Sequence, residues 1–443
     1  MNSDLDKPIK IGICGFGTVG GGTLALLQSN GDEISRRLGR NIQVSRIASR
    51  SIKISDFDES GIQVATDPFE LISDSEVDIV IETLGGFDPA FEVVRQALLN
   101  GKHVVTANKA LIAERGNELF SVAQDNGVTL SYESSVAGGI PIIKALREGL
   151  AANKINWLAG IINGTGNFIL TEMADKQRQF DDVLQQAQEL GYAEADPTFD
   201  VEGIDAAHKL TIMASIAFGI PLQFDKTYTE GISHIKPEDI NYAAELGYRI
   251  KHLGIARLSD KGVEMRVHPT LISRKQLLAN VDGVGNAVMV HGNAVGSTLY
   301  SGPGAGAAAT ASAVVADIID IARAMEQGIT TPIVPALGYR TIHQDLKVVD
   351  IEDIESEYYL RIPAKDVVGV MAKISNILQE CGISIEAVIQ KEVSSDSVPI
   401  VILTHRAVEK QMNSAISAIE QLQDIVGTIT RIRVETLTEN SEA

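Results

Sequence analysis

IKIGICGFGTVG, residues 9 to 20, joins a short β-rich run to a glycine-rich turn and the start of a helical stretch. The turn has the spacing G-x-G-x-x-G, in which the first glycine permits a tight bend and the second lets backbone approach a pyrophosphate. The third glycine lets helix and strand pack closely, and the flanking strand and helix are the context that the motif requires. The sequence therefore predicts a dinucleotide site formed by Gly15, Phe16, Gly17, Thr18, Val19 and Gly20.

Working outward, four more β-rich runs follow before about Ser135, namely QVSRIAS, VDIVIET, HVVTA and VTLSYE. Amphipathic segments separate them, and this alternation is typical of βαβ units and a parallel sheet. A second glycine-rich loop, SGPGAG, leads into a long apolar helix that ends near Gln327 and is expected to pack back on this sheet. We therefore predict an α/β fold whose Rossmann-type NAD(P)-binding domain comprises residues 1–135 and about 303–337.

The middle of the chain has a different pattern. VEMRVHPTLI, NAVMV and AVGSTLY read as antiparallel strands, the last two joined by a turn at Gly292-Asn293, and residues 155–170 read as a further strand. Residues 136–302 are thus expected to form an α+β substrate-binding domain. Acidic residues 338–356 read as a linker, and residues 357–443 show the βαββαβ order of a ferredoxin-like sandwich.

Bulk composition limits the classes of partner. The 443 residues carry a formal net charge of −20, which repels nucleic acid phosphates and anionic lipid, so neither is expected as a partner. Cys14 and Cys381 are too few and too far apart for a disulfide framework, and the N-terminus lacks the pattern of a signal peptide. These features favour a cytoplasmic protein.

The cofactor preference depends on the end of the second strand. An NAD-selective site would have a carboxylate there, whereas this chain has Arg50 and, soon after, Lys53, which suit a 2′-phosphate and favour NADP. Solvated loop charges are the alternative explanation, so NAD use stays open. Thr83 ends a buried strand where the nicotinamide ribose is expected, and the loop from Gly302 to Gly306 is a candidate to close over the cofactor.

Two lysines are candidate catalytic residues because of their positions. Lys109 follows the strand HVVTA at the edge where the cofactor cleft should open, and Lys209 lies four residues after Asp205 on one helix face. An isolated pair at this spacing is usually a surface salt bridge, which is the alternative here. His208 and His103 are interpreted as surface or boundary residues rather than catalytic ones, and Trp157 as a packing residue.

Six segments in order resemble the homoserine dehydrogenase family over nearly the whole chain: GFGTVG, TANK, ESSVAGGIPII, GIINGTGNFIL, GYAEADPTFDVEGIDAAHK and SGPGAG. The resemblance implies NAD(P)-dependent interconversion of L-homoserine and L-aspartate 4-semialdehyde, within threonine and methionine biosynthesis. It also implies a homodimer, formed through the sheet of the middle domain.

The resemblance implies roles for individual residues. Lys209 matches the acid/base lysine, Asp205 its carboxylate neighbour, and Lys109 a lysine that contacts substrate and nicotinamide. The expected substrate-binding residues are Glu194, Asp200, Asp205, Thr165, Gly191 and Tyr192. A structural site for a monovalent cation such as Na⁺ is expected at Glu133, Val136, Gly138 and Ile140. The chemistry agrees, because reduction of an aldehyde leaves an alkoxide that a positioned ammonium can stabilise and protonate.

The C-terminal module resembles an ACT domain, which implies feedback control with threonine as the natural effector. The turn from Pro363 to Val370 matches the ligand-binding turn of such modules, and Gly369 would let an effector approach backbone. A module that only pairs chains is the alternative. Two further alternatives for the whole chain are an NADP-linked dehydrogenase acting on aspartate and a non-catalytic amino-acid sensor.

Overall fold

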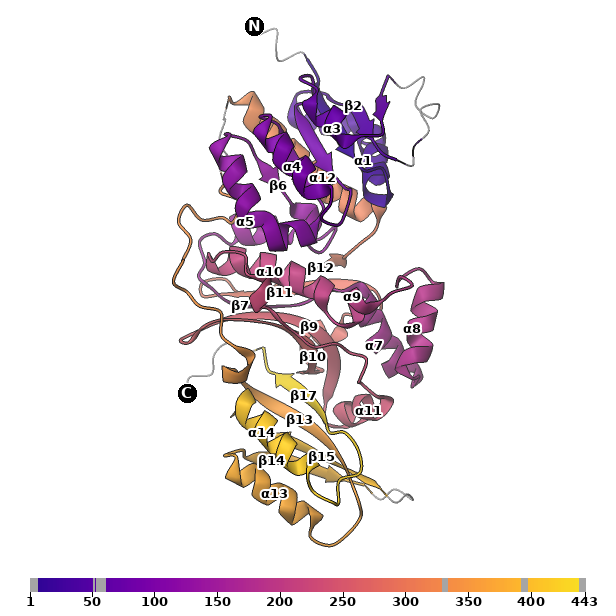
Figure 1. Ribbon diagram of the computed structural model, residues 1–443, viewed down its shortest axis with the longest axis vertical. Coiled ribbons are helices and arrows are strands. Elements are labelled where there is room, and N and C mark those ends of the chain that lie inside the picture. The colour runs from indigo at the N-terminus through magenta and orange to yellow at the C-terminus, as the bar shows by residue number, and fades with distance from the viewer. Residues whose placement is uncertain (1–6, 51, 53–60, 329–333, 392–396, 438–443) are drawn as a thin grey trace.

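The computed structural model describes residues 7–50, 52, 61–328, 334–391 and 397–437. Figure 1 shows three tiers along the long axis: an N-terminal sheet with its helices, a middle sheet, and a C-terminal sheet with two helices. The N-terminal tier is the α/β domain that the glycine-rich turn predicted. None of the helices in the described ranges is long and apolar enough to cross a membrane.

The first sheet has six strands in the order β3-β2-β1-β4-β5-β6, and all neighbouring pairs are parallel. Its strands are β1 (Ile9–Cys14), β2 (Ile42–Ala48), β3 (Gln63–Ala65), β4 (Ile79–Glu82), β5 (His103–Thr106) and β6 (Leu130–Ser131). Its helices are α1 (Thr18–Ser29), α2 (Gly31–Leu38), α3 (Pro68–Ser73), α4 (Ala90–Leu99) and α5 (Lys109–Asp125). The central strands β1 and β4 are almost wholly buried because helices cover both faces of the sheet, whereas β2 carries the more exposed Gln43 and Arg46.

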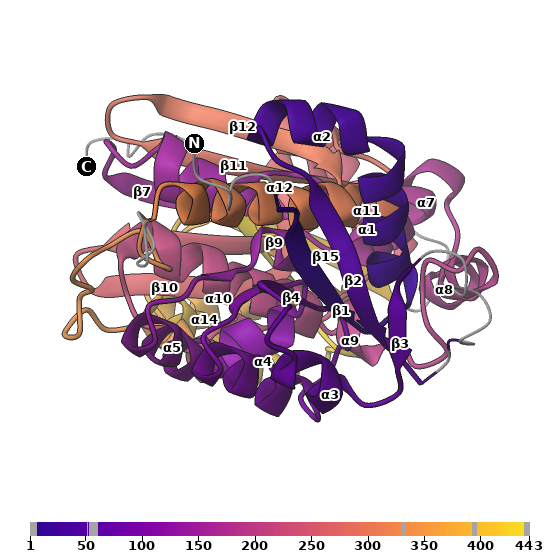
Figure 2. The ribbon, with the colours of Figure 1, turned by 90° about the horizontal axis from the view of Figure 1, so that it is seen from above.

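Helix α12 (Ala307–Glu326) belongs to this tier although it comes almost two hundred residues later in the chain. It lies beside α1 (Figure 2), and its Val314 and Ile318 pack with Ile9 and Ile11 of β1. A Cβ at Gly22 of α1 would lie 2.8 Å from the carbonyl oxygen of Ala307, so this glycine permits the close approach of the two helices.

Among the described residues, the second sheet has eleven strands and continues from the middle tier into the C-terminal tier. Its order is β12-β11-β7-β9-β10-β17-β13-β15-β14, with β8 paired to β10 and β16 paired to β13. The strands are β7 (Ile155–Ile161), β8 (Tyr228–Thr229), β9 (Tyr248–Ser259), β10 (Gly262–Ser273), β11 (Gly285–Gly292), β12 (Gly296–Pro303), β13 (Glu355–Ala364), β14 (Ile385–Gln390), β15 (Val398–Thr404), β16 (Ala407–Val408) and β17 (Thr430–Glu435). The hairpin predicted at Gly292-Asn293 joins β11 to β12.

Most helices of the middle tier lie between the two sheets or at one side of the second (Figure 1). They are α6 (Ile142–Lys144), α7 (Gly164–Lys176), α8 (Phe180–Glu189), α9 (Thr198–Val201), α10 (Ile204–Phe218) and α11 (Pro237–Glu245). The strand predicted over residues 155–170 is therefore wrong after Ile161. The Asn163 side chain accepts a hydrogen bond from Gly166 N–H and starts α7, which overrides the β propensity of the apolar residues that follow.

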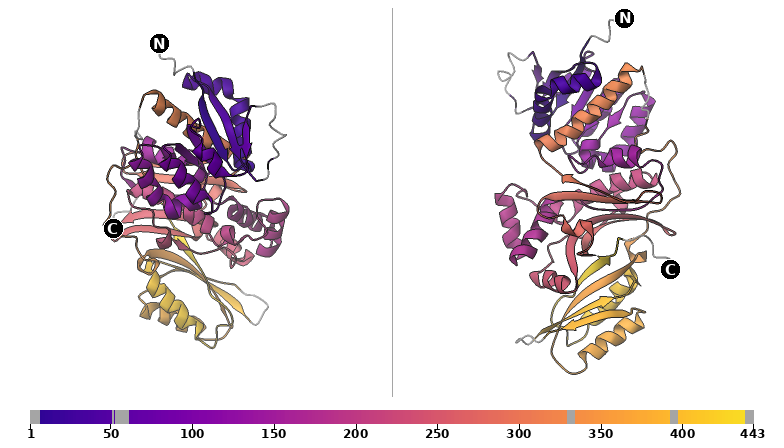
Figure 3. Two further views of the ribbon diagram at one scale, coloured as in Figure 1. Left: turned by 45° about the horizontal axis from the view of Figure 1, so that its top comes forward. Right: turned by 180° about the vertical axis from the view of Figure 1, so that it is seen from behind.

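The C-terminal tier has β13, α13 (Val370–Glu380), β14, β15, α14 (Glu409–Glu420) and β17 in the predicted βαββαβ order. Its strands lie in the order β17-β13-β15-β14 with antiparallel neighbours. The two helices cover one face (Figure 3), and the other face packs against helices of the middle tier. The sequence did not predict that β17 also pairs in parallel with β10, where Thr270 aligns with Arg433.

The segment between the middle and C-terminal tiers has little regular structure but is held by the middle sheet. Val263 N–H donates to the carbonyl of Lys347, and Val349 N–H donates to the carbonyl of Val263. A Cβ at Gly219 would lie 3.2 Å from the ring of Tyr339, so this tyrosine also packs closely on the end of α10.

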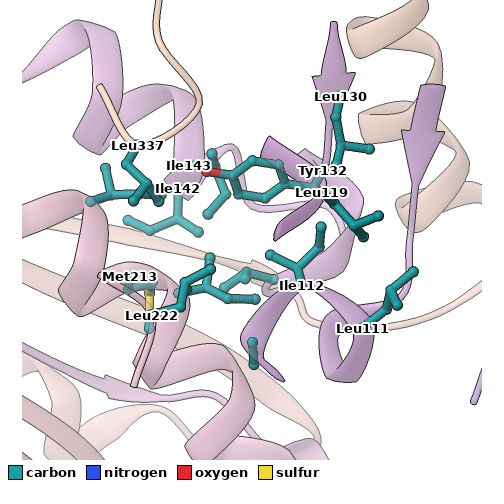
Figure 4. Close-up of a cluster of buried hydrophobic side chains, with 14 of the residues drawn as sticks. Leu111, Ile112, Leu119, Leu130, Tyr132, Ile142, Ile143, Met213, Leu222 and Leu337 are labelled. Carbon is teal, nitrogen blue, oxygen red and sulfur yellow. The ribbon is translucent and has the colours of Figure 1, made fainter. Parts of the chain in front are cut away.

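One apolar cluster joins the first tier to the middle tier. Figure 4 shows Met213 of α10 beside Leu222, with Ile142 and Ile143 above them and Ile112 of α5 between them and Leu111. Helix α10 is buried on all sides as a result, from Asp205 to Phe218. Any polar side chain on this helix must therefore find its partners inside the protein.

Candidate active site

Asp205 and Lys209 occupy the first two turns of α10, between the two sheets. The Lys209 ammonium donates to Asp205 Oδ2 at 2.7 Å and to the carbonyl oxygen of Ile162 at 2.7 Å. Both side chains are buried. The pair is therefore an internal ion pair, and the surface salt bridge that the spacing alone suggested is excluded.

Lys109 reaches the same carboxylate from the first residue of α5. Its Nζ lies 3.1 Å from Asp205 Oδ1, so each oxygen of Asp205 faces a different lysine. Burial would raise the pKa of Asp205, but Lys209 and then Lys109 hold it well below its ordinary value. The carboxylate of Asp205 is therefore ionised.

Asn163, which the sequence analysis missed, organises the acidic side of this site. Its amide donates to Asp200 Oδ1 at 2.7 Å and to Asp205 Oδ2 at 2.9 Å, while its carbonyl caps α7. Burial raises the pKa of Asp200, and the nearby carboxylate of Asp205 raises it further. The Asn-Gly-Thr-Gly sequence directly after a strand was the available signal, since asparagine is a preferred N-cap.

The other expected substrate-binding residues lie around the start of α7 and the loop between α8 and α9. Thr165 donates its hydroxyl to the carbonyl of Tyr192 at 2.6 Å, and the Tyr192 ring meets Phe168 edge to face. Gly191 has a φ of +74° and lies exposed. The Glu194 side chain is also exposed, and within the described ranges no ion pair joins it to the lysines.

The glycine-rich turn has the geometry that a pyrophosphate requires. A Cβ at Gly20 would lie 2.2 Å from the carbonyl oxygen of Gly15, so the third glycine is a packing requirement. A Cβ at Gly17 would meet nothing within 4 Å, so the backbone there faces open space at the N-terminus of α1. Thr83 donates its hydroxyl to the carbonyl of Gly15 at 2.8 Å and holds the turn in place.

The remaining predicted cofactor residues have different surroundings. Thr18 is exposed, whereas Phe16 and Val19 are half-buried against the first core. Arg50 is exposed just beyond β2, and Lys53 lies outside the described residues. Gly302 lies in β12 and pairs with Asn286, and the loop after it brings the carbonyl of Gly304 within 2.6 Å of a Cβ at Gly138.

The residues of the expected cation site come together just after β6. The Glu133 carboxylate accepts hydrogen bonds from the N–H groups of Ile143 at 3.0 Å and Lys144 at 2.8 Å. Val136, Gly138 and Ile140 are in the turn between them, and Gly138 has a φ of +52°. Burial, with Asp317 nearby, raises the pKa of Glu133 to about 7. No group of three or more His, Cys, Asp or Glu side chains in the described ranges is arranged to hold a metal ion.

The structure corrects the interpretation of one histidine. His208 is not a surface residue but is buried, stacked on Phe224 and 3.1 Å from Glu114 Oε1. The cause is that every face of α10 is covered, which a helical pattern cannot reveal. His103 begins β5 and accepts a hydrogen bond from Thr129 N–H. Trp157 is buried in β7 and stacks on His291, as its packing role predicted.

Comparison with known families agrees with this geometry. The family model "Homoserine dehydrogenase" matches residues 141–319, and the model "Homoserine dehydrogenase, NAD binding domain" matches residues 15–133. A homoserine dehydrogenase of Pseudomonas aeruginosa is 58% identical over 434 residues, covering 97% of this chain and 100% of the relative. The chain belongs to the homoserine dehydrogenase family. It is thus an NAD(P)-dependent oxidoreductase.

Solved homoserine dehydrogenase structures give the same result. The crystal structure of a homoserine dehydrogenase from Thiobacillus denitrificans is 55% identical, with a TM-score of 0.93 over 98% of this chain and 99% of that one. A hyperthermophilic archaeal homoserine dehydrogenase in complex with NADPH is 28% identical, with a TM-score of 0.61. That match covers 71% of this chain and 98% of the archaeal one. The NAD(P)-binding Rossmann fold of this homoserine dehydrogenase is therefore well supported.

Proposed function

We propose that this homoserine dehydrogenase interconverts L-homoserine and L-aspartate 4-semialdehyde with Lys209 as the acid/base residue. The observation that carries the proposal is the orientation of the Lys209 ammonium. Its hydrogen bonds to the carbonyl oxygen of Ile162 and to Asp205 Oδ2 fix this orientation. Within the described ranges its third N–H has no partner, so it is available to the substrate oxygen. Nicotinamide supplies or accepts the hydride when it is bound.

The residues around Lys209 support this assignment. In the reducing direction, Lys209 protonates the oxygen that gains electrons, while Lys109 adds positive charge beside it. In the oxidising direction, Lys209 takes a proton from the hydroxyl group of the substrate. The zwitterionic substrate needs carboxylates for its own ammonium, and Asp200 and Glu194 are the candidates.

Exchange of Lys209 for methionine tests the proposal. We expect Lys209→Met to lower kcat for homoserine oxidation by about 10²–10⁴-fold, the usual contribution of an acid/base residue. The measurement is homoserine-dependent absorbance of the reduced nicotinamide. Lys251→Met is the matched control, since Lys251 is also buried and pairs with Asp282 at 2.9 Å outside the site. A Lys209→Met enzyme as active as the control would refute the proposal.

For the cofactor we propose a preference for NADP, with NAD also accepted. Arg50 is exposed directly after β2, where an NAD-selective site would have a carboxylate. Its positive charge makes it the proposed partner of the 2′-phosphate. Arg50→Ala is expected to raise the KM for NADP and to leave the KM for NAD nearly unchanged. Steady-state kinetics with both cofactors would show this, and an equal effect on both would contradict the assignment.

Regulation by an amino acid is the next part of the proposal. The C-terminal βαββαβ unit resembles an ACT domain, and Gly369, with a φ of +94°, precedes α13 where an effector could approach backbone. Threonine is the proposed inhibitor, acting through this unit. Kinetics with and without threonine, on the parent and on Gly369→Val, would test both the effect and the place.

A monovalent cation, a homodimer and a cytoplasmic location complete the proposal. The Glu133 carboxyl is buried with Asp317 nearby, and a cation such as Na⁺ would offset their negative charge. Strand β12 ends the second sheet, and the middle tier around it is the proposed dimer surface. Cys14 and Cys381 are free and lie in different tiers, so this fold does not depend on the oxidising compartment that a disulfide requires. A gel-filtration mass of one 47.4 kDa chain would exclude the dimer.

A further inference from the structure

Two arginines of β17 bind two carboxylates at the junction of the middle and C-terminal tiers. Arg433, which is fully buried, donates to Glu409 from Nε at 3.0 Å and from Nη2 at 2.6 Å. Its Nη1 donates to Glu230 Oε2 at 2.7 Å. Arg431 pairs with the same two carboxylates, at 2.6 Å and 3.3 Å. Glu409 belongs to the C-terminal tier, whereas Glu230 follows β8 in the middle tier.

Glu230 is held by its neighbours as a charged group. The hydroxyl of Tyr228 also donates to its Oε2, at 2.8 Å. Burial would raise the pKa of Glu230, but Arg433 and Arg431 hold it below its ordinary value. Loss of one partner from such a buried group leaves an uncompensated charge, so the position of Glu230 is tightly linked to that of β17.

The backbone that follows Glu230 contacts the turn between Asp200 and Asp205. Glu230 N–H donates to the carbonyl of Val267 at 2.8 Å, and its own carbonyl lies 3.0 Å from His252 Nε2. Two residues on, Ile232 N–H donates to the carbonyl of Val201 at 3.0 Å. The backbone from 230 to 232 is therefore fixed on both sides, by β10 and β9 and by the end of α9.

Gly231 and Gly203 show how tightly these parts pack. A Cβ at Gly231 would lie 2.4 Å from Glu202 Oε2 and 2.8 Å from the carbonyl oxygen of Val201. A Cβ at Gly203, whose φ is +82°, would lie 3.1 Å from the His252 ring. The segment 230–232 and the turn 201–203 are in direct contact without space between them, so a displacement of one requires a displacement of the other.

The turn 201–203 joins α9 to α10 and so sets the distance between Asp200 and Asp205. We propose that Glu230 is a positioning residue for the dehydrogenase reaction: its ion pairs with Arg433 and Arg431 place segment 230–232, which holds the turn 201–203 and thereby the two carboxylates of the site. The same contacts connect strand β17 of the C-terminal tier with the lysine pair. This inference rests on the proposed roles of Asp200, Asp205 and Lys209.

A matched pair of variants separates positioning from general stabilisation. Glu230→Gln and Glu409→Gln each remove one carboxylate from the same two arginines, but within the described ranges only Glu230 belongs to the segment that contacts the turn 201–203. We expect Glu230→Gln to lower kcat/KM for homoserine about tenfold, because small displacements of reacting groups are costly. The KM for the cofactor should stay within about twofold, since the fingerprint turn is remote.

Glu409→Gln is expected to lower the melting temperature but to keep kcat/KM for homoserine. Equal losses of kcat/KM in the two variants, or no loss in Glu230→Gln, would overturn the inference. If Glu230→Gln does not fold, Gly231→Ala tests the same contact from the other side, since its methyl group would push on Glu202 and Val201. An unchanged kcat/KM for homoserine in Gly231→Ala would then overturn it.

The two proposals fail in different ways. An active Lys209→Met enzyme would refute the proposed function. An inactive Lys209→Met enzyme together with unaffected Glu230→Gln and Gly231→Ala variants would refute only the positioning role.

Discussion

Asn163 bridges the carboxylates of Asp200 and Asp205, which would otherwise repel each other. Its single amide group donates to both Asp200 and Asp205, and its carbonyl starts α7. One side chain thus joins the capping of a helix to the arrangement of the site. The reason that asparagine suits this position is that it carries two N–H donors and an acceptor on one planar group.

We expect Asn163→Ala to reduce both activity and stability. The two carboxylates lose a donor, and the free energy of unfolding should fall by about 1–3 kcal/mol, the cost of an unsatisfied buried polar group. Chemical denaturation and homoserine kinetics would measure the two effects. Asn293→Ala serves as the control, because Asn293 accepts a hydrogen bond only at an exposed hairpin. A variant of Asn163 with parental kinetics would contradict this role.

His252 predicts a specific pH dependence of stability. Burial lowers its pKa from 6.5 to about 4, so the folded protein holds it neutral. The unfolded chain binds its proton first as pH falls, so this contribution to stability is complete above pH 6.5 and is lost towards pH 4. The slope for one such group is at most about 1.4 kcal/mol per pH unit.

His252→Gln checks this prediction because glutamine keeps a donor for the carbonyl of Glu230 without titrating. The free energy of unfolding of the variant should depend less steeply on pH between 6.5 and 4 than that of the parent. Other histidines and carboxylates contribute to both proteins and cancel in the comparison. Parallel pH profiles would show that His252 does not titrate in this window.

At the scale of elements, two glycines at the start of α1 have different roles, Gly17 as its N-cap residue and Gly20 within its first turn. Gly17 faces open space, whereas Gly20 contacts the carbonyl of Gly15. We expect Gly17→Ala to raise the KM for the cofactor severalfold with an unchanged melting temperature, because the methyl group occupies the place of the pyrophosphate. Gly20→Ala should lower the melting temperature, since a Cβ cannot lie 2.2 Å from an oxygen. A stable Gly20→Ala protein, or an unaffected cofactor KM in Gly17→Ala, would contradict these assignments.

Elements also show where local patterns mislead. Residues 164–170 have a strand-like composition but form the first half of α7, because a local cap decides the start of the helix. The spacing of Asp205 and Lys209 in α10 is typical of a surface salt bridge, yet this helix is buried on all sides. In that setting an i, i+4 ion pair changes from a weak surface contact to the centre of the site.

For the whole molecule, the second sheet joins the C-terminal tier to the middle tier. Strand β17 pairs with β10 on one side and with β13 on the other, and carries the buried Arg433. A chain that ends at residue 354 would expose the edge of β10 and leave Glu230 and Arg266 without their partners from β17. The C-terminal tier is therefore expected to be indispensable for stability.

We expect that truncated chain to be poorly soluble or to melt well below the parent protein, with loss of basal activity. Soluble yield, melting temperature and homoserine oxidation are the measurements. Lys373→Ala is the control, because it removes only an exposed ion pair to Asp424 and should cost no more than about 0.5 kcal/mol. A fully active, equally stable truncated enzyme would show that the pairing of β17 with β10 contributes little.

Short-range patterns determined much of this protein from sequence. The glycine spacing after a β-rich run predicted the parallel sheet and its cofactor turn. The succession of strand-like and helical runs in residues 357–443 predicted the βαββαβ unit. Both patterns depend on neighbours within a few residues. Lys109, Asp205 and Lys209 were also identified as candidates, although their contact was not.

Tertiary structure alone decided how distant residues meet. The contact of Lys109 with Asp205, the bridge made by Asn163, the burial of His208 and the pairing of β17 with β10 each join segments far apart in the chain. No periodicity within one segment encodes which other segment will cover it, because that depends on the packing of whole sheets and helices. The orientation of the Lys209 ammonium follows from that packing.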